Sequence, residues 1–166
     1  HFLKVRLQAI ANGENLNRSD FDKDGMEISK DSFKGKPLLC AFPKNKYSSG
    51  YKLGDGHNQS GVLYDSEYDE FYHSYLDPNS ERMVGYIPTN SEITIELIDG
   101  KHWMCMDAVI LKKYNYELVK DILNKKNGKS KRNNKRISVE IEVLESHMRN
   151  HETENYEVEV IDKFKG

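Results

Sequence analysis

The sequence predicts a mostly β chain with one or two helices, an α+β fold, and three observations lead to this. Apolar and polar residues alternate in several short runs, which is the period of a strand with one buried face. Asp99-Gly100 separates two such runs and is a strong signal for a two-residue hairpin. Apolar residues at helical spacing occur near 115–126, so one amphipathic helix is expected there.

The bulk properties bound the class of protein. The 166 residues fit one domain over 1–166, and we expect it to be truncated at its C-terminal end, because the chain stops inside an apolar and basic stretch. A net charge of −2 gives no general attraction to nucleic acid. No run approaches the roughly 20 apolar residues of a membrane helix, and no signal peptide opens the chain, so a soluble cytoplasmic protein is expected. Cys40 and Cys105 lack disulfide or zinc spacing and are predicted to be buried thiols.

The first two thirds of the chain contain the predicted β-meander. Alternating or apolar runs predict strands at 2–11, 38–42, 82–87, 92–98 and 102–111. The polar stretch 12–35 is expected to be a loop with one helical turn near 28–33. Residues 43–79 are rich in Tyr, Ser, Gly, Asp and Asn, and are expected to pack over a core rather than build one.

The last third is expected to hold the helix and a hairpin. Asn115 can cap the helix at 115–126 and Gly128 can end it. Residues 127–136 are basic with no apolar side chain, so a flexible, protease-sensitive linker is predicted. The alternating runs 137–144 and 156–162 predict an antiparallel hairpin whose polar turn is centred near residue 150.

Ser138 and His57 are the candidates for nucleophilic chemistry. A serine hydroxyl becomes a nucleophile when an imidazole takes its proton and another group orients that imidazole. Ser138 lies on the polar face of its predicted strand, where most serines are ordinary surface residues. His57 follows Gly56 in a glycine-rich loop, and such loops present side chains at the edges of sites.

Two patterns raise the question of metal binding. Asp20, Asp22, Asp24 and Asp31, with Gly25, match positions of the EF-hand calcium loop, but Glu27 stands at a usually aliphatic position and no amphipathic helix precedes the loop. An acidic surface loop is therefore the preferred interpretation. His147 and His151 have a spacing that binds metal on a helix, but no third ligand is evident. No metal or other cofactor is predicted.

The order of motifs carries a resemblance to a known family. His57 in GDGHN, the meander, a single helix, a basic linker and ISVEIEV follow one another as in the prohead proteases of tailed phages, which resemble the herpesvirus assembly protease in fold. The opening KVRLQAIANGENLNRSDF, then SFKGKPLL and VGYI, is similar to the start and middle of such domains. The resemblance implies a compact antiparallel β-barrel-like protease domain, with Ser138 as nucleophile and His57 as base.

The third catalytic group is open among three residues. A hairpin turning near residue 150 pairs Ser138 near Ile161, which brings Asp162 and Glu159 within reach, and a one-residue change of register exchanges the two faces. Asp162 is preferred. His151 is the alternative by analogy with the herpesvirus enzymes, whose third member resembles a second histidine.

The function that the resemblance implies is a serine endopeptidase. Its substrates would be scaffold and major capsid proteins inside the assembling phage prohead, in the host cytoplasm, and a homo-oligomer is compatible with this role. The alternatives are a non-enzymatic head-assembly or scaffold protein on the same fold, and a calcium-binding module using Asp20, Asp22, Asp24 and Asp31. Neither nucleic acid nor a membrane is expected as a partner.

Overall fold

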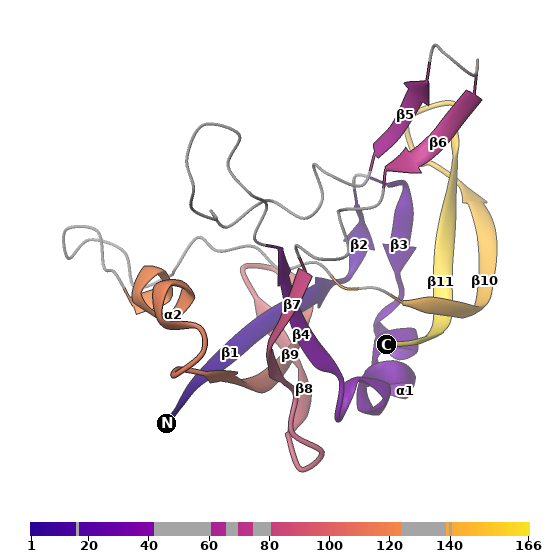
Figure 1. Cartoon of the computed structure of the whole chain (residues 1–166). Helices are drawn as coiled ribbons and strands as arrows, with labels where there is room; N and C mark the ends of the chain where they lie inside the picture. The colour runs from indigo at the N-terminus through magenta and orange to yellow at the C-terminus, as the bar shows by residue number, and fades with distance from the viewer. Residues whose placement is uncertain (16, 42–60, 66–69, 75–80, 124–138, 140) are drawn as a thin grey trace. The chain divides into compact units, whose positions relative to one another are not determined.

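The computed structural model describes residues 1–15, 17–41, 61–65, 70–74, 81–123, 139 and 141–166 (Figure 1). The chain divides into two compact units. The first comprises His1–Leu3, Pro37–Gly85 and Ile110–Ser138, and the second comprises Lys4–Lys36, Tyr86–Val109 and Val139–Gly166.

The strands of the described residues form three sheets. The five-stranded sheet has the order β1-β9-β7-β4, with β8 paired to β9, and is built from β1 (Phe2–Ala11), β4 (Pro37–Ala41), β7 (Glu81–Tyr86), β8 (Ile93–Ile98) and β9 (Lys101–Leu111). The four-stranded sheet has the order β10-β11-β3-β2, from β2 (Gly13–Glu14), β3 (Ser19–Phe21), β10 (Glu142–Asn150) and β11 (Glu157–Lys165). A two-stranded sheet pairs β5 (Gly61–Asp65) with β6 (Glu70–Ser74). The helical elements are α1 (Lys23–Ser29), the short 3₁₀ helix η1 (Lys30–Phe33) and α2 (Tyr116–Leu123).

The predicted fold class is confirmed. Over the described residues the chain is mostly β with two α-helices. The five strands expected between residues 2 and 111 are all present, with ends that agree or shift by one residue. Asp99 and Gly100 have φ of 52° and 80° and join β8 to β9, because a two-residue hairpin turn of this hand needs positive φ at both positions.

The core of the second unit forms where α1 and η1 pack against β11. Phe164 is fully buried, and its ring meets the edges of Phe21 and Phe33 at centroid distances of 5.3 and 6.2 Å. Met26 of α1 and Val158 of β11 are also fully buried. Burying side chains of this size supplies roughly 1.5–3 kcal/mol each, so this cluster fixes α1 on the strand.

Residues 12–35 are more ordered than the sequence predicted. The expected loop contains β2, β3, α1 and η1. Asp22 starts α1 by accepting the backbone N–H groups of Asp24 and Gly25 at 3.0 and 3.1 Å. The helical turn expected near 28–33 is present, as the end of α1 and η1, but the remaining elements were missed because they are short. A helix of seven residues, whose buried positions include Gly25 and Ser29, shows almost no apolar period.

Helix α2 of the first unit agrees with its prediction. It begins directly after Asn115, whose carbonyl accepts the N–H of Val119 at 2.9 Å. The Asn115 side chain is buried, and its Nδ2 donates to the carbonyls of Val84 and Leu111. Leu118 and Val119 are buried as the apolar stripe requires. The predicted helix end at Gly128 and the linker 127–136 lie outside the described residues.

The C-terminal hairpin exists, but its first strand lies later than predicted. β10 runs over Glu142–Asn150, so most of the predicted polar turn is strand, whereas Val139 and Ile141 are not. Ser146, and not Ser138, lies opposite Ile161. The alternation in 137–143 was misleading because nearly all of β10 is exposed on both faces, and such a strand needs no apolar period.

Two smaller predictions have mixed outcomes. Cys105 is buried as expected, but Cys40 is only half-buried, because it lies on β4, where exposure alternates from residue to residue. The segment 43–79, expected to pack over a core rather than build one, contains the antiparallel pair β5 and β6. The remainder of that segment lies outside the described residues.

Candidate functional site

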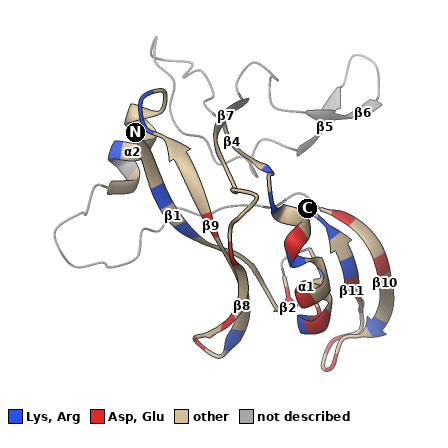
Figure 2. Ribbon diagram, turned by 90° about the horizontal axis from the view of Figure 1, so that it is seen from below, with Lys and Arg blue, Asp and Glu red and all other residues tan. Residues whose placement is uncertain are grey.

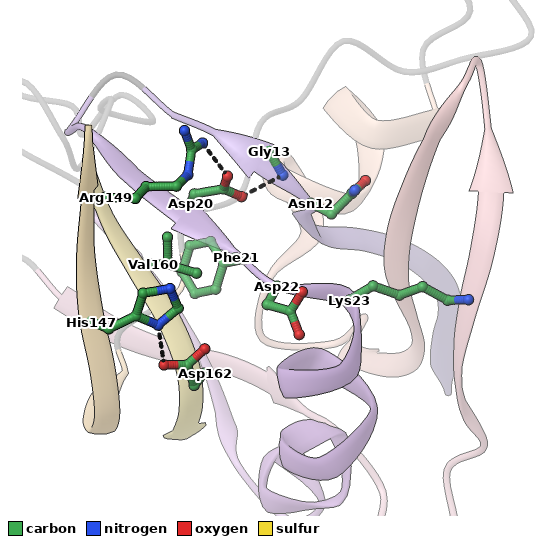
Figure 3. Close-up of a pocket in the computed structure, with 10 residues that line it drawn as sticks. All are labelled: Asn12, Gly13, Asp20, Phe21, Asp22, Lys23, His147, Arg149, Val160 and Asp162. Atoms are coloured by element: carbon green, nitrogen blue, oxygen red, sulfur yellow. Dashed lines mark hydrogen bonds and ion pairs between the residues drawn. The ribbon is translucent and has the colours of Figure 1, made fainter. Parts of the chain in front are cut away.

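A pocket in the second unit is lined largely by polar side chains. Its volume is about 380 Å³, and Figure 3 shows the residues that line it. β10 and β11 form one wall, and β3 and the start of α1 form the other. The lining residues are Asn12, Gly13, Asp20, Phe21, Asp22, Lys23, His147, Arg149, Val160 and Asp162.

An imidazole and a carboxylate pair in this pocket. His147 Nδ1 lies 2.7 Å from Asp162 Oδ2. β10 and β11 bring them together because His147 lies opposite Val160, and Asp162 is the next residue of β11 on the same face. Figure 3 shows the ring turned into the pocket from its strand. With Asp162 as acceptor, the proton sits on Nδ1 and leaves Nε2 free to accept another, the tautomer of a general base in a Ser-His-Asp triad.

Asp20 holds the opposite wall to β10. Its Oδ1 accepts the N–H of Gly13 at 3.0 Å, and its Oδ2 accepts from Arg149 at 2.7 Å. This hydrogen bond raises the pKa of Arg149 above its usual value. Because both carboxylate oxygens are engaged, Asp20 joins β2, β3 and β10 across the pocket (Figure 3).

The rim on the α1 side carries the remaining charges. Asp22 Oδ2 caps the helix, as described above. Lys23 extends away from His147 and Asp162 in Figure 3, toward the far side of the pocket. The pocket lining therefore has no dominant sign of charge. Its polar groups are suited to orienting a bound molecule through hydrogen bonds more than to attracting an ion.

The two alternatives for the third catalytic group are engaged elsewhere. Glu159 Oε1 accepts a hydrogen bond from the Ser146 hydroxyl at 2.8 Å, and Glu159 does not line the pocket. His151 Nδ1 accepts the backbone N–H of Glu154 at 3.0 Å in the turn between β10 and β11. Its Nε2 lies 3.4 Å from Glu14, and its ring stacks on Tyr156 at 4.6 Å. Of the three candidates, Asp162 is the one that lines the pocket.

The other two predicted site residues lie outside the described residues. These are His57 and Ser138. The register argument that linked Ser138 to Asp162 is wrong, because Ser146 occupies the position opposite Ile161. The sequence reasoning missed His147 as the partner of Asp162. A hairpin turn placed at 151–156 would have found it, since that register sets His147 diagonal to Asp162.

The calcium interpretation is contradicted by the local structure. α1 and η1 occupy most of the segment that an EF-hand uses as its loop. Asp22 caps α1, and Asp31 pairs with Lys34 at 2.7 Å, whose hydrogen bond lowers the pKa of Asp31. Within the described ranges, no cluster of three His, Cys, Asp or Glu side chains is placed to hold a metal ion.

The zinc interpretation of His147 and His151 also fails. His147 is on β10 and His151 follows that strand, where four residues span about 13 Å. Zinc ligands must all lie about 2 Å from the ion, so two histidines at this separation do not share one.

No helix among the described residues is long and apolar enough to span a membrane.

Comparisons with known proteins identify the family. No curated protein and no solved structure gives a significant match to the chain. The family model of the YonD N-terminal domain matches residues 1–166. The chain therefore belongs to the YonD N-terminal domain family, which is phage-related.

Proposed function

We propose that this chain is a serine endopeptidase that cleaves scaffold and major capsid proteins during phage head assembly. The observation that carries the proposal is the His147–Asp162 pair, whose Nδ1···Oδ2 distance is 2.7 Å and whose ring faces a pocket. The match of the whole chain to a phage-related family and the order of its motifs support the biological setting.

In the proposed reaction Ser138 Oγ attacks the carbonyl carbon of the scissile peptide bond. A histidine Nε2 takes the hydroxyl proton and then gives it to the leaving amine nitrogen, which breaks the C–N bond. Asp162 holds the Nδ1–H of that imidazole and stabilises the imidazolium form. Water then attacks the acyl-enzyme ester, and its proton returns through the same histidine to Ser138.

Two histidines are candidates for the base, and each is supported by a different argument. His57 is implied by the resemblance to prohead proteases. His147 is favoured by its contact with Asp162. An Asp–His unit needs a single base, so replacement of the correct histidine should abolish cleavage, whereas replacement of the other should leave most of it.

The test is mass spectrometry of the full chain incubated with its scaffold and capsid proteins. We compare the wild type with Ser138→Ala, His57→Ala and His147→Ala, and we expect cleavage to be lost in Ser138→Ala. Ser146→Ala is the matched control, because that hydroxyl binds Glu159 outside the pocket lining. Cleavage that persists in Ser138→Ala would overturn the nucleophile. Binding of scaffold without cleavage by the wild type would favour the non-enzymatic head-assembly protein instead.

A further inference from the structure

β10 is an edge strand with exposed apolar side chains. The four-stranded sheet ends at β10, and Figure 2 shows it beyond β11, on the side away from α1. Leu144 is 48% exposed and Met148 is 56% exposed. Soluble proteins usually protect a long edge strand with charge, proline or a covering segment, because its free backbone groups template pairing with another strand.

The free backbone groups of β10 can be assigned from its turn. His151 N–H donates to the carbonyl of Tyr156 at 2.9 Å, so the backbone of position 151 faces β11. The N–H and C=O groups of successive residues point to opposite sides of a strand. Those of Ser146, Met148 and Asn150 therefore face away from β11. Ser146 is also the middle residue of Glu142–Asn150.

We propose that two copies of this chain associate through β10, antiparallel, with a two-fold axis at Ser146. This register pairs the whole strand with itself. It sets Leu144 opposite Met148 of the second copy, so that the two exposed apolar side chains cover each other. It also sets Glu145 opposite His147 of the second copy, a carboxylate facing an imidazole. The two four-stranded sheets then become one continuous sheet.

Apolar contact selects this register over its neighbour. β10 has a register shift between Val143 and Ser146, and a two-fold axis at Met148 would use only the regular half of the strand. That axis, however, sets Leu144 opposite Glu152, which lies beyond the end of β10, so the exposed leucine gains no apolar partner. The axis at Ser146 sets Leu144 opposite Met148.

The first test is the oligomeric state of the full chain, measured by sedimentation velocity over a range of concentrations. We expect a dimer whose dissociation constant rises at least tenfold in Met148→Lys and in Leu144→Lys. Leu97→Lys is the matched control, because Leu97 is 68% exposed on β8 and takes no part in the proposed contact. A wild type that stays monomeric at every concentration, or equal weakening by Leu97→Lys, would overturn the proposal.

The second test reports the register directly and does not depend on dimer strength. In Ser146→Cys the two thiols lie on opposed residues, whose Cα atoms are about 5.5 Å apart, within the range of a disulfide. In Met148→Cys the thiols of the two copies are instead offset by four residues, about 13 Å along the strand. We expect a disulfide-linked dimer, mapped by peptide mass spectrometry, in the first variant alone. A cross-link in Met148→Cys instead would overturn the axis at Ser146.

Discussion

The backbone carbonyl of Asp162 lies against the Cα of Gly25, in the space that a side chain at position 25 would need. A Cβ placed there would lie 2.4 Å from the Asp162 oxygen. Glycine therefore lets α1 approach β11 closely, at the residue whose carboxylate holds His147.

Gly25→Ala should destabilise the second unit and shift Asp162. The added methyl has to push backbone away from backbone, and overpacking of this kind costs about 1–3 kcal/mol of the free energy of unfolding. Urea denaturation followed by circular dichroism measures this loss. Glu27→Ala, on the exposed side of the same helix, is the control and should change the free energy by about 0.5 kcal/mol or less. A fully stable Gly25→Ala variant would show that α1 is free to move from β11.

Asp162→Asn should reduce peptidase activity while leaving the fold intact. An amide at this position favours the wrong tautomer of the imidazole, and in enzymes with this pair the loss of rate is about 10⁴-fold. Glu159→Gln is the matched control on the same strand, because Glu159 binds Ser146 and does not line the pocket. Initial rates on a scaffold peptide provide the measurement. Equal rates for the two variants would remove Asp162 from the mechanism.

Ser29→Ala should cost about 1–3 kcal/mol, although the change is small. Ser29 is buried, and its Oγ accepts the N–H of Phe164 at 3.0 Å. Without the hydroxyl that N–H has no acceptor in the core, and a buried unsatisfied donor carries its full desolvation cost. Hydrogen exchange should show faster exchange at the Phe164 amide than in the wild type. Unchanged protection of that amide would mean that another group replaces the hydroxyl.

Cys105 should react with iodoacetamide only after unfolding. Burial raises the pKa of its thiol, so the protonated, unreactive form persists in the folded chain at pH values where a free cysteine ionises. A raised pKa in the folded state means that the stability contributed by the neutral thiol is complete below the unfolded pKa of about 8.5 and is lost as the pH rises through the folded pKa. Peptide mass spectrometry between pH 7 and 9 distinguishes its labelling from that of Cys40. Equal labelling of both cysteines in the folded chain would contradict this.

The sequence predicted best where burial imposes a period. β1 alternates between exposed and half-buried side chains, β9 buries Met104, Met106, Ala108 and Ile110 at alternate positions, and α2 buries Leu118 and Val119, so their patterns are readable. Prediction failed where polar contacts replace burial. α1 depends on a cap at Asp22 and on close packing at Gly25, and neither leaves an apolar period.

The same cause explains the candidate site. Asp162 was predicted for a register that the chain does not adopt, and its partner His147 was assigned to a turn. β10 is exposed on nearly all of its length, so its position along the chain is set by pairing with β11 and not by its own pattern. Only the pairing brings the imidazole and the carboxylate together.

The parallel contact between β3 and β11 has a consequence for synthesis on the ribosome. Ser19, Asp20 and Phe21 pair with Glu159, Val160 and Ile161, from opposite ends of the sequence. A nascent chain therefore leaves Phe21 and Met26 without their buried contacts until β11 has emerged. Closing so long a loop costs entropy that only the contacts between β3 and β11 repay, so this unit should fold only after β11 has emerged. Chains released before β11 should be substrates for chaperones and proteases.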